Sequence, residues 1–298
     1  MTATATLRIG TRNSRLALAQ AAIAAEALGA AVGSVELVPI STRGDAISAR
    51  RPRGRWVEAD GQFTRELERA LLTGEIDLAV HSYKDLPTAP VDGLVIGAVL
   101  VRGDARDCLV TRDGGGLDGL PFGARIGTSS PRRAAQLAAA RADLVAMPIR
   151  GNVETRLRRL EEASEYDGLI LAAAGLDRLG IAVPDAARLP FELMLPAPAQ
   201  GALAVQVRSD HALDDALAHV EHAPTRVAVE AERALLRALG GGCLAPLGAL
   251  GEVDGGRLRL RAAYEDRSGA YVRAEASGQA ADVVVTEVAD AIRRALAA

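Results

Sequence analysis

The sequence predicts an α/β protein with two similar α/β domains around a cleft and a smaller α+β domain at its C-terminal end. Strand-like and helix-like patterns alternate along the first half of the chain and start again near residue 100. Such alternation is typical of βαβ units and a largely parallel sheet. The last section differs, because a helical pattern there is followed by the pattern of a β-meander and by a terminal helix. We expect the first domain to comprise residues 1–99 with 200–218, the second 100–199 and the third 219–298.

Each element is predicted from its periodicity and its flanking residues. In the first domain we expect strands at 6–10, 35–40, 77–82 and 202–207, and helices at 14–28 and 62–72. In the second domain we expect strands at 107–111, 124–129, 143–149 and 167–175, and helices at 131–141 and 153–162. In the third we expect helices at 225–239 and 283–297, with the meander over 247–278 between them.

Composition limits the function classes. Hydrophobic residues make up 49% of the 298 residues but aromatic residues only 3%, so the cores must be built from Ala, Leu, Val and Ile. The net charge of −3 comes from 35 basic and 38 acidic residues. A global basic field for nucleic acid or an anionic membrane is therefore absent.

The chain shows no targeting or membrane signal. The segment "MTATATLRIG" lacks the basic and apolar regions of a signal peptide, and apolar runs such as "LILAAAGL" fall far short of the roughly 20 residues that span a bilayer. The two cysteines, Cys108 and Cys243, do not make a disulfide framework. We expect a soluble cytoplasmic protein.

Three strand-to-helix junctions carry arginine where a helix N-terminus would meet a ligand. The first has Arg12 and Ser14, the second Ser129, Ser130, Pro131, Arg132 and Arg133, and the third Arg150, Asn152 and Arg156. Free backbone N–H groups, the helix dipole and guanidinium groups together favour the binding of a carboxylate or a phosphate. Neither a Walker loop nor a "GxGxxG" motif occurs, so a nucleotide triphosphate is not indicated. Three separate cationic junctions are better suited to a ligand with several carboxylates. A solvated charged face is the alternative.

A polar group ends the predicted strand in "DLAVHSYKDLP". After the apolar residues come His81, Ser82, Lys84 and Asp85, before Pro87. A neighbouring lysine favours the ionised form of Asp85, which can then accept protons or stabilise a developing cation. The alternative is an ordinary turn in which Asp85 bonds its own backbone.

The histidines and cysteines give different indications. His219 and His222 in "HVEH" have the wrong spacing for a zinc-binding helix, so we expect no catalytic metal. Cys108 lies on an apolar strand pattern and is expected to be a core thiol. Three glycines precede Cys243, which is more backbone freedom than a helix cap needs and suggests that something bulky approaches there. A generous helix stop before a buried cysteine is the alternative.

Motifs along nearly the whole chain resemble one family. They are, in order, "IGTRNSRLALAQ", "ELVPISTRGD", "DLAVHSYKDLP", "IGTSSPRRAAQL", "IRGNVETRL", "LAAAGLDRLG", "AQGALAVQ" and "AERALLRALGGGCLAPLGA". They resemble the hydroxymethylbilane synthases, also called porphobilinogen deaminases. Only the residues after about 250 are generic.

The resemblance implies a monomeric three-domain transferase of porphyrin and haem biosynthesis that passes its product to the next enzyme of the pathway. It implies that four porphobilinogen molecules are joined head to tail, with loss of four ammonia, on a dipyrromethane cofactor held by a thioether to Cys243. The linear tetrapyrrole is then released by hydrolysis. The catalytic carboxylate would be Asp85. Substrate or cofactor carboxylates would be bound by Arg12, Ser14, Lys84, Ser129, Ser130, Arg132, Arg133, Arg150 and Arg156.

Three positions depart from the family pattern. Asp60 and Gln62 stand where lysine and leucine are usual, in a loop expected to cover the cleft, and Gln206 replaces a common acidic residue.

Two other classes of function remain open. A cytoplasmic two-lobed solute-binding protein for a small polycarboxylate, like the periplasmic binding proteins, would explain the arginines but not Asp85 or Cys243. A cysteine-nucleophile acyl transferase would need a base near Cys243, and no histidine has a sequence context that marks it for this.

Overall fold

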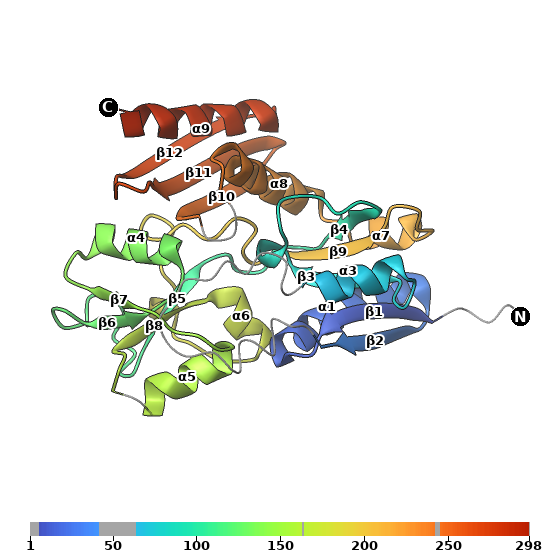
Figure 1. The fold of residues 1–298 in the computed structure, drawn as a ribbon, viewed down its shortest axis with the longest axis horizontal. Helices are drawn as coiled ribbons and strands as arrows, with labels where there is room; N and C mark the ends of the chain where they lie inside the picture. Colours follow the sequence, from blue (N-terminus) through green and yellow to red (C-terminus); the bar gives the residue numbers. More distant parts are fainter. Residues whose placement is uncertain (1–5, 42–63, 163, 242–244, 298) are drawn as a thin grey trace, which may run out of the picture.

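The computed structural model describes residues 6–41, 64–162, 164–241 and 245–297. Two α/β lobes lie side by side, and a third unit with its own sheet lies across them (Figure 1). The α/β class and the smaller C-terminal α+β unit are as predicted. Buried residues of the cores are mostly Leu, Ile, Val and Ala, which confirms the expectation from composition.

The first lobe is built on a five-stranded sheet in the order β2-β1-β3-β9-β4. Its strands are β1 (Leu7–Arg12), β2 (Val35–Ile40), β3 (Leu78–Ser82), β4 (Leu94–Val99) and β9 (Leu203–Arg208). Its helices are α1 (Arg15–Val32), α3 (Arg65–Leu72) and α7 (Asp214–Val220), with a 3₁₀ turn η1 (Tyr83–Asp85) after β3. Residues of α1 and α7 share one core cluster with the sheet, and α3 contributes to another.

The second lobe is built on a four-stranded sheet in the order β5-β8-β6-β7. Its strands are β5 (Asp107–Thr111), β6 (Arg125–Gly127), β7 (Val145–Met147) and β8 (Gly168–Ala172). Its helices are α4 (Pro131–Ala140), α5 (Val153–Glu162) and α6 (Ala173–Arg178), with a 3₁₀ turn η2 (Asp185–Ala187).

Both sheets are mixed, so the expectation of a largely parallel sheet is only partly correct. In the first lobe β2, β1 and β3 are parallel, and β9 runs antiparallel to β3 and β4. In the second, β7, β6 and β8 are parallel and β5 runs antiparallel to β8. The antiparallel strands β5 and β9 follow the two chain crossings between the lobes. The two sheets share this pattern of three parallel strands and an antiparallel neighbour.

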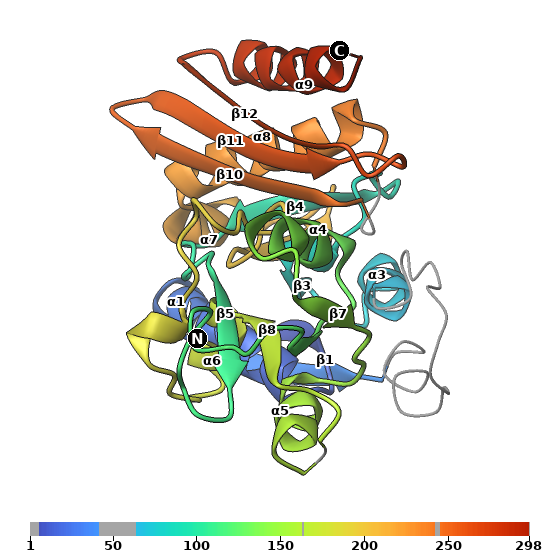
Figure 2. The same ribbon diagram turned by 90° about the vertical axis from the view of Figure 1, so that its left-hand side faces the viewer.

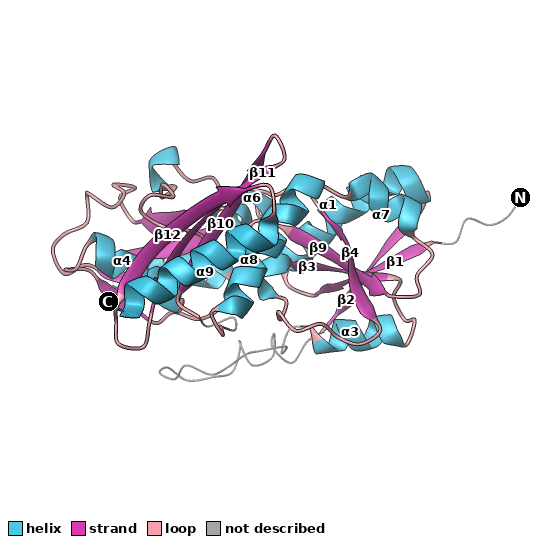
Figure 3. Cartoon of the chain, turned by 90° about the horizontal axis from the view of Figure 1, so that it is seen from above, coloured by secondary structure: helices cyan, strands magenta, loops and turns pink. Residues whose placement is uncertain are grey.

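The third unit is an antiparallel meander of β10 (Leu247–Asp254), β11 (Arg257–Glu265) and β12 (Tyr271–Gly278). Helices α8 (Ala223–Ala238) and α9 (Ala281–Ala297) contact each other and share one core cluster with this sheet (Figure 3). Helix α4 of the second lobe lies on the other side of the sheet from α9 and contacts β11 (Figure 2). The third unit therefore touches the second lobe through its sheet.

Local signals explain three of the helix ends. The Ser14 and Ser130 side chains accept bonds from the third residue after each, as the N-cap position requires. Gly240 has φ +68 just after α8, the left-handed conformation that ends helices. The predicted strand at 167–175 is too long, because Ala173 begins α6. Strand β4 and helix α7 were not predicted.

Candidate active site

The carboxyl ends of β1 and β3 form one side of the site. These strands are parallel neighbours, so Arg12 at the end of β1 lies near the residues that follow β3. Lys84 and Asp85 lie in the turn η1 directly after β3. Asp85 is exposed, whereas Tyr83 and Leu86 are buried at 2% and 4% exposure. The turn thus presents a carboxylate to solvent from a backbone that is fixed on both sides.

His81 lies beneath this turn as a neutral imidazole. It is buried, and its Nε2 is 3.1 Å from Oε1 of Gln206. The His81 pKa is lowered to about 4, mainly by burial; the Gln206 bond opposes the shift and the charge of Arg12 adds to it. Gln206, which departs from the family pattern, is therefore the partner of a buried histidine.

We expect His81 to make the fold sensitive to acid. The unfolded chain binds a proton at His81 below its ordinary pKa of about 6.5, but the native state does not until about pH 4. This contribution to stability is present above pH 6.5 and is lost as the pH falls toward 4. Between pH 7 and pH 5 the free energy of unfolding should fall by about 2 kcal/mol from this group. Urea unfolding at both pH values measures the change.

The Gln206→Glu variant should reduce that loss, because a carboxylate beside the imidazole favours its protonated form. The matched control is His219→Gln, which changes an exposed histidine and should leave the pH dependence as it is. The same pH dependence in wild type and Gln206→Glu would contradict the role given to His81.

Arg132 and Arg133 turn their guanidinium groups to Asp107 at the start of β5. Arg132 Nη1 lies 2.7 Å from Asp107 Oδ2, and Arg133 Nη2 lies 2.6 Å from Oδ1. All three residues are buried. Burial opposes ionisation of Asp107, but the charges and hydrogen bonds of the two arginines outweigh it and hold the carboxyl pKa well below its usual range. Two arginines in a first turn are thus explained in part by one buried carboxylate, which leaves one positive charge in excess.

Lys84 joins the two lobes. Its Nζ donates to Gln200 Oε1 at 3.2 Å, and Gln200 Nε2 donates to Asp107 Oδ1 at 2.9 Å. Burial is the main cause that lowers the Lys84 pKa to about 8. The charges of Asp85 and Asp107 oppose this shift, and the charges of Arg133 and Arg132 add to it. The lysine from the first lobe is therefore close to the ion cluster of the second.

Arg156 adds a half-buried cation to this region. Its Nε donates to the Gly151 carbonyl at 2.8 Å, and no carboxylate pairs with it within the described ranges. Burial, together with the charge of Arg133, lowers its pKa to about 10. A half-buried guanidinium without a carboxylate partner is available to bind an anion.

The other residues predicted to bind carboxylates form helix caps, hold the local backbone or lie exposed in a loop. Ser14 and Ser130 cap α1 and α4. The Ser129 hydroxyl donates to the Ile149 carbonyl at 2.7 Å and accepts from the Ile149 amide at 3.0 Å, so it holds the backbone after β7. Arg150 is exposed in the loop between β7 and α5. The structure thus brings together Lys84, Asp85, Arg132, Arg133 and Arg156, with Arg12 near His81.

The structure describes only one of the two cysteines. Cys108 is fully buried in β5, as predicted, and burial raises its thiol pKa to about 11. Cys243 lies outside the described residues, as do Asp60 and Gln62. Across the ranges that the structure describes, no group of three or more His, Cys, Asp or Glu side chains is arranged to hold a metal ion.

Sequence reasoning missed Asp107 and Gln200. Asp107 directly precedes Cys108, and a charged residue at the start of an apolar strand was a signal that it needs a buried partner. Gln200 lies in the quoted "AQG" motif but was given no role. It is buried, and it links Lys84 to Asp107.

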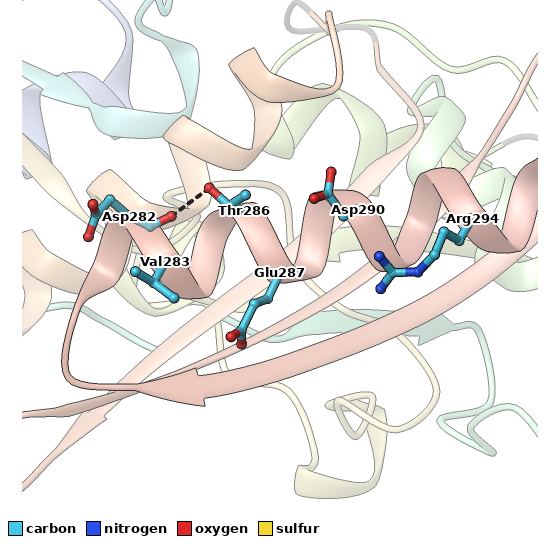
Figure 4. Close-up of a pocket in the computed structure, with 6 residues that line it drawn as sticks. All are labelled: Asp282, Val283, Thr286, Glu287, Asp290 and Arg294. Atoms are coloured by element: carbon cyan, nitrogen blue, oxygen red, sulfur yellow. Dashed lines mark hydrogen bonds between the residues drawn. The ribbon is translucent and has the colours of Figure 1, made fainter.

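A depression on the outer face of α9 is a separate feature (Figure 4). It is lined by Asp282, Val283, Thr286, Glu287, Asp290 and Arg294. Three carboxylates and one guanidinium make it unsuitable for a ligand that carries several carboxylates. The basic cluster between the lobes is the better candidate for such a ligand.

The fold and the site define a class: a two-lobed α/β protein with a third α+β unit and a cluster of cationic side chains between its lobes. A family model described as "Porphobilinogen deaminase, dipyromethane cofactor binding domain" matches residues 7–215, and "Porphobilinogen deaminase, C-terminal domain" matches 227–294. The chain belongs to the porphobilinogen deaminase family.

Curated relatives agree with the family models. The chain is 51% identical to "Porphobilinogen deaminase" of Desulforudis audaxviator over 91% of this chain and 88% of that protein. It is 47% identical to the protein of the same name from Thermobifida fusca, over 97% and 89%. The relative from Xanthomonas axonopodis pv. citri is 47% identical over 93% and 91%.

Solved structures with a weak likeness to this chain include solute-binding proteins. The methionine-binding protein MetQ is 13% identical, with a TM-score of 0.41 over 72% of this chain and 89% of that chain. A periplasmic substrate-binding protein from Coxiella burnetii is 16% identical, with a TM-score of 0.43 over 76% and 96%. Both TM-scores are below 0.5, so these likenesses carry no argument about this chain.

Proposed function

We propose that the chain joins four porphobilinogen molecules head to tail with loss of four ammonia and releases linear hydroxymethylbilane by hydrolysis, which makes it a transferase. Membership of the porphobilinogen deaminase family supports this reaction. The single observation in the structure that supports it best is the cationic cluster of Lys84, Arg132 and Arg133 around one buried carboxylate, Asp107, with Arg156 near Arg133.

The residues present suit a group that carries several carboxylates. The family model that covers most of the chain is named for a dipyrromethane cofactor. We place this cofactor on a thioether to Cys243, after the glycines that end α8. When bound, it supplies the pyrrole carbon to which the first substrate is joined. The arginines and Lys84 would hold its carboxylates, because guanidinium and ammonium groups bind carboxylates most strongly where water is excluded.

Binding of substrate falls to the same cationic groups. Porphobilinogen carries one acetate and one propionate, so each addition brings two more negative charges to the site. Arg12, Arg150 and Arg156 extend the cationic surface from the end of β1 to the loop before α5. Ser14 and Ser130 leave other backbone N–H groups of the first turns of α1 and α4 to face an anion.

Asp85 is the group that we assign to the chemistry. Loss of ammonia from porphobilinogen leaves positive charge on its pyrrole, and a fixed carboxylate stabilises that charge. The same carboxylate can accept the proton that leaves when two pyrroles are joined. One carboxylate serves every addition, so the growing chain must shift past it between steps.

The remaining features of the proposal concern organisation. We propose three domains with boundaries at 1–99 plus 200–218, 100–199 and 219–298, and a monomer in the cytoplasm. Within the described residues, no helix is long and apolar enough to cross a bilayer.

The reaction is tested by incubating the purified protein with porphobilinogen and measuring ammonia and product together. We expect one ammonia for each porphobilinogen consumed and a linear tetrapyrrole in solution. Saturable binding of porphobilinogen by cofactor-loaded protein without ammonia would instead favour a solute-binding protein. A protein that neither binds nor consumes porphobilinogen would contradict both.

A further inference from the structure

An arginine of helix α8 in the third unit binds the backbone of the turn that carries Asp85. Arg233, which is 7% exposed, donates from Nη1 to the carbonyls of Tyr83 at 3.2 Å and Leu86 at 2.9 Å. Its Nη2 donates to the Pro87 carbonyl at 2.7 Å. The acceptors lie on both sides of Asp85, so one guanidinium fixes the backbone before and after the carboxylate.

The same helix also holds the side chain of Tyr83. The Arg233 guanidinium carbon lies 4.5 Å from the centre of the Tyr83 ring, which is cation–π geometry. The Tyr83 hydroxyl donates to Glu230, one turn earlier on α8. On the other side, the Tyr83 amide donates to the Ala202 carbonyl at 3.0 Å, which connects the turn to the residue before β9.

Asp85 itself has little to orient it. Its side chain is exposed, so its direction depends on the backbone of η1 rather than on packing around the carboxylate. A displacement of about 1 Å in a reacting group can reduce a rate about 100-fold. Arg233 binds three carbonyls of this short segment from another part of the fold, and it is thus the contact best placed to prevent such a displacement.

We propose that Arg233 is a positioning residue for Asp85, which acts on the reaction by holding the backbone from Tyr83 to Pro87. This inference rests on the proposed function, because it requires Asp85 to act in the chemistry. Arg233 also lies ten residues before Cys243, on the helix that leads to the glycines. The same helix therefore supports the carboxylate and leads to the segment where the cofactor is proposed to be attached.

The first test is Arg233→Met, which keeps a long side chain but removes all the donors. We expect kcat to fall about 10- to 100-fold and KM to change less than about threefold, because the carboxylate-binding groups are untouched. Arg233→Lys, which keeps the charge over the Tyr83 ring, should recover part of kcat. The matched control is Arg237→Met, one turn later on the same helix, where the arginine is exposed; its kcat should equal that of wild type.

A double-mutant cycle with Asp85→Asn separates positioning from general support of the fold. If Arg233 acts through Asp85, Arg233→Met should lower turnover little or not at all in the Asp85→Asn background. Equal losses in both backgrounds, or a wild-type kcat in Arg233→Met, would overturn the proposal. Should Arg233→Met fail to fold, the same cycle with Arg233→Lys decides the question.

The outcome for Asp85→Asn alone is read separately. If that single variant keeps wild-type turnover, the role of Asp85 in the proposed function fails, and positioning by Arg233 fails with it. If Asp85→Asn loses turnover but the cycle is additive, the proposed function stands and only the positioning role is rejected. The two failures are therefore distinguishable.

Discussion

Replacing Asp85 with asparagine should reduce turnover of porphobilinogen by about 100- to 10,000-fold, the range that a lost acid–base group produces. Asparagine keeps the size of the side chain but neither the negative charge nor the proton acceptor. Because Asp85 is exposed in the turn after β3, the fold should be preserved. Steady-state ammonia release and thermal unfolding of the same preparation measure the two effects together.

The matched control for this variant is Asp92→Asn, an exposed aspartate in the segment before β4. It should change neither turnover nor stability, since exposed charges contribute little. If Asp85→Asn keeps near-normal activity, Asp85 is not part of the mechanism. If it loses activity only because it unfolds, the thermal unfolding curve will show this.

The local structure was largely predictable from the sequence because its signals are local. Ser14 and Ser130 cap helices in the way their positions predict, and Gly240 ends α8 with the backbone conformation expected of glycine. Strand pairing was less predictable. The antiparallel direction of β9 depends on where the chain returns from the second lobe, and nothing in residues 202–207 records that direction.

The candidate site was predicted in its residue types but not in its contacts. The arginines at the start of α4 were expected to face an anion, and the structure pairs them with Asp107, which lies 25 residues away from Arg132 in sequence. Gln200 and Arg233 act across separations of 116 and 147 residues, to Lys84 and to Leu86. No periodicity or motif spacing reports a contact between such distant segments. Only the fold brings these residues together.

The two cysteines give a prediction that depends on their different surroundings. Cys108 is fully buried and burial raises its thiol pKa, so it is a poor nucleophile at neutral pH. Cys243 follows the glycines after α8 and is the residue to which we assign the covalent cofactor. We therefore expect Cys243→Ser to lack the covalent cofactor and to lose turnover completely, while Cys108→Ala keeps both.

Intact-mass measurement of the purified proteins, followed by peptide mapping, tests this assignment. In cells that make porphobilinogen, wild type and Cys108→Ala should carry an added mass of two joined pyrroles on the peptide that contains Cys243. Unmodified wild-type protein should gain that mass when porphobilinogen is added, because an apoprotein can still assemble its primer. An adduct that persists in Cys243→Ser but disappears in Cys108→Ala would show that the wrong thiol was assigned. Wild-type protein that never gains the mass would contradict covalent attachment altogether, since the cationic site would then hold its ligand only by charge and hydrogen bonds.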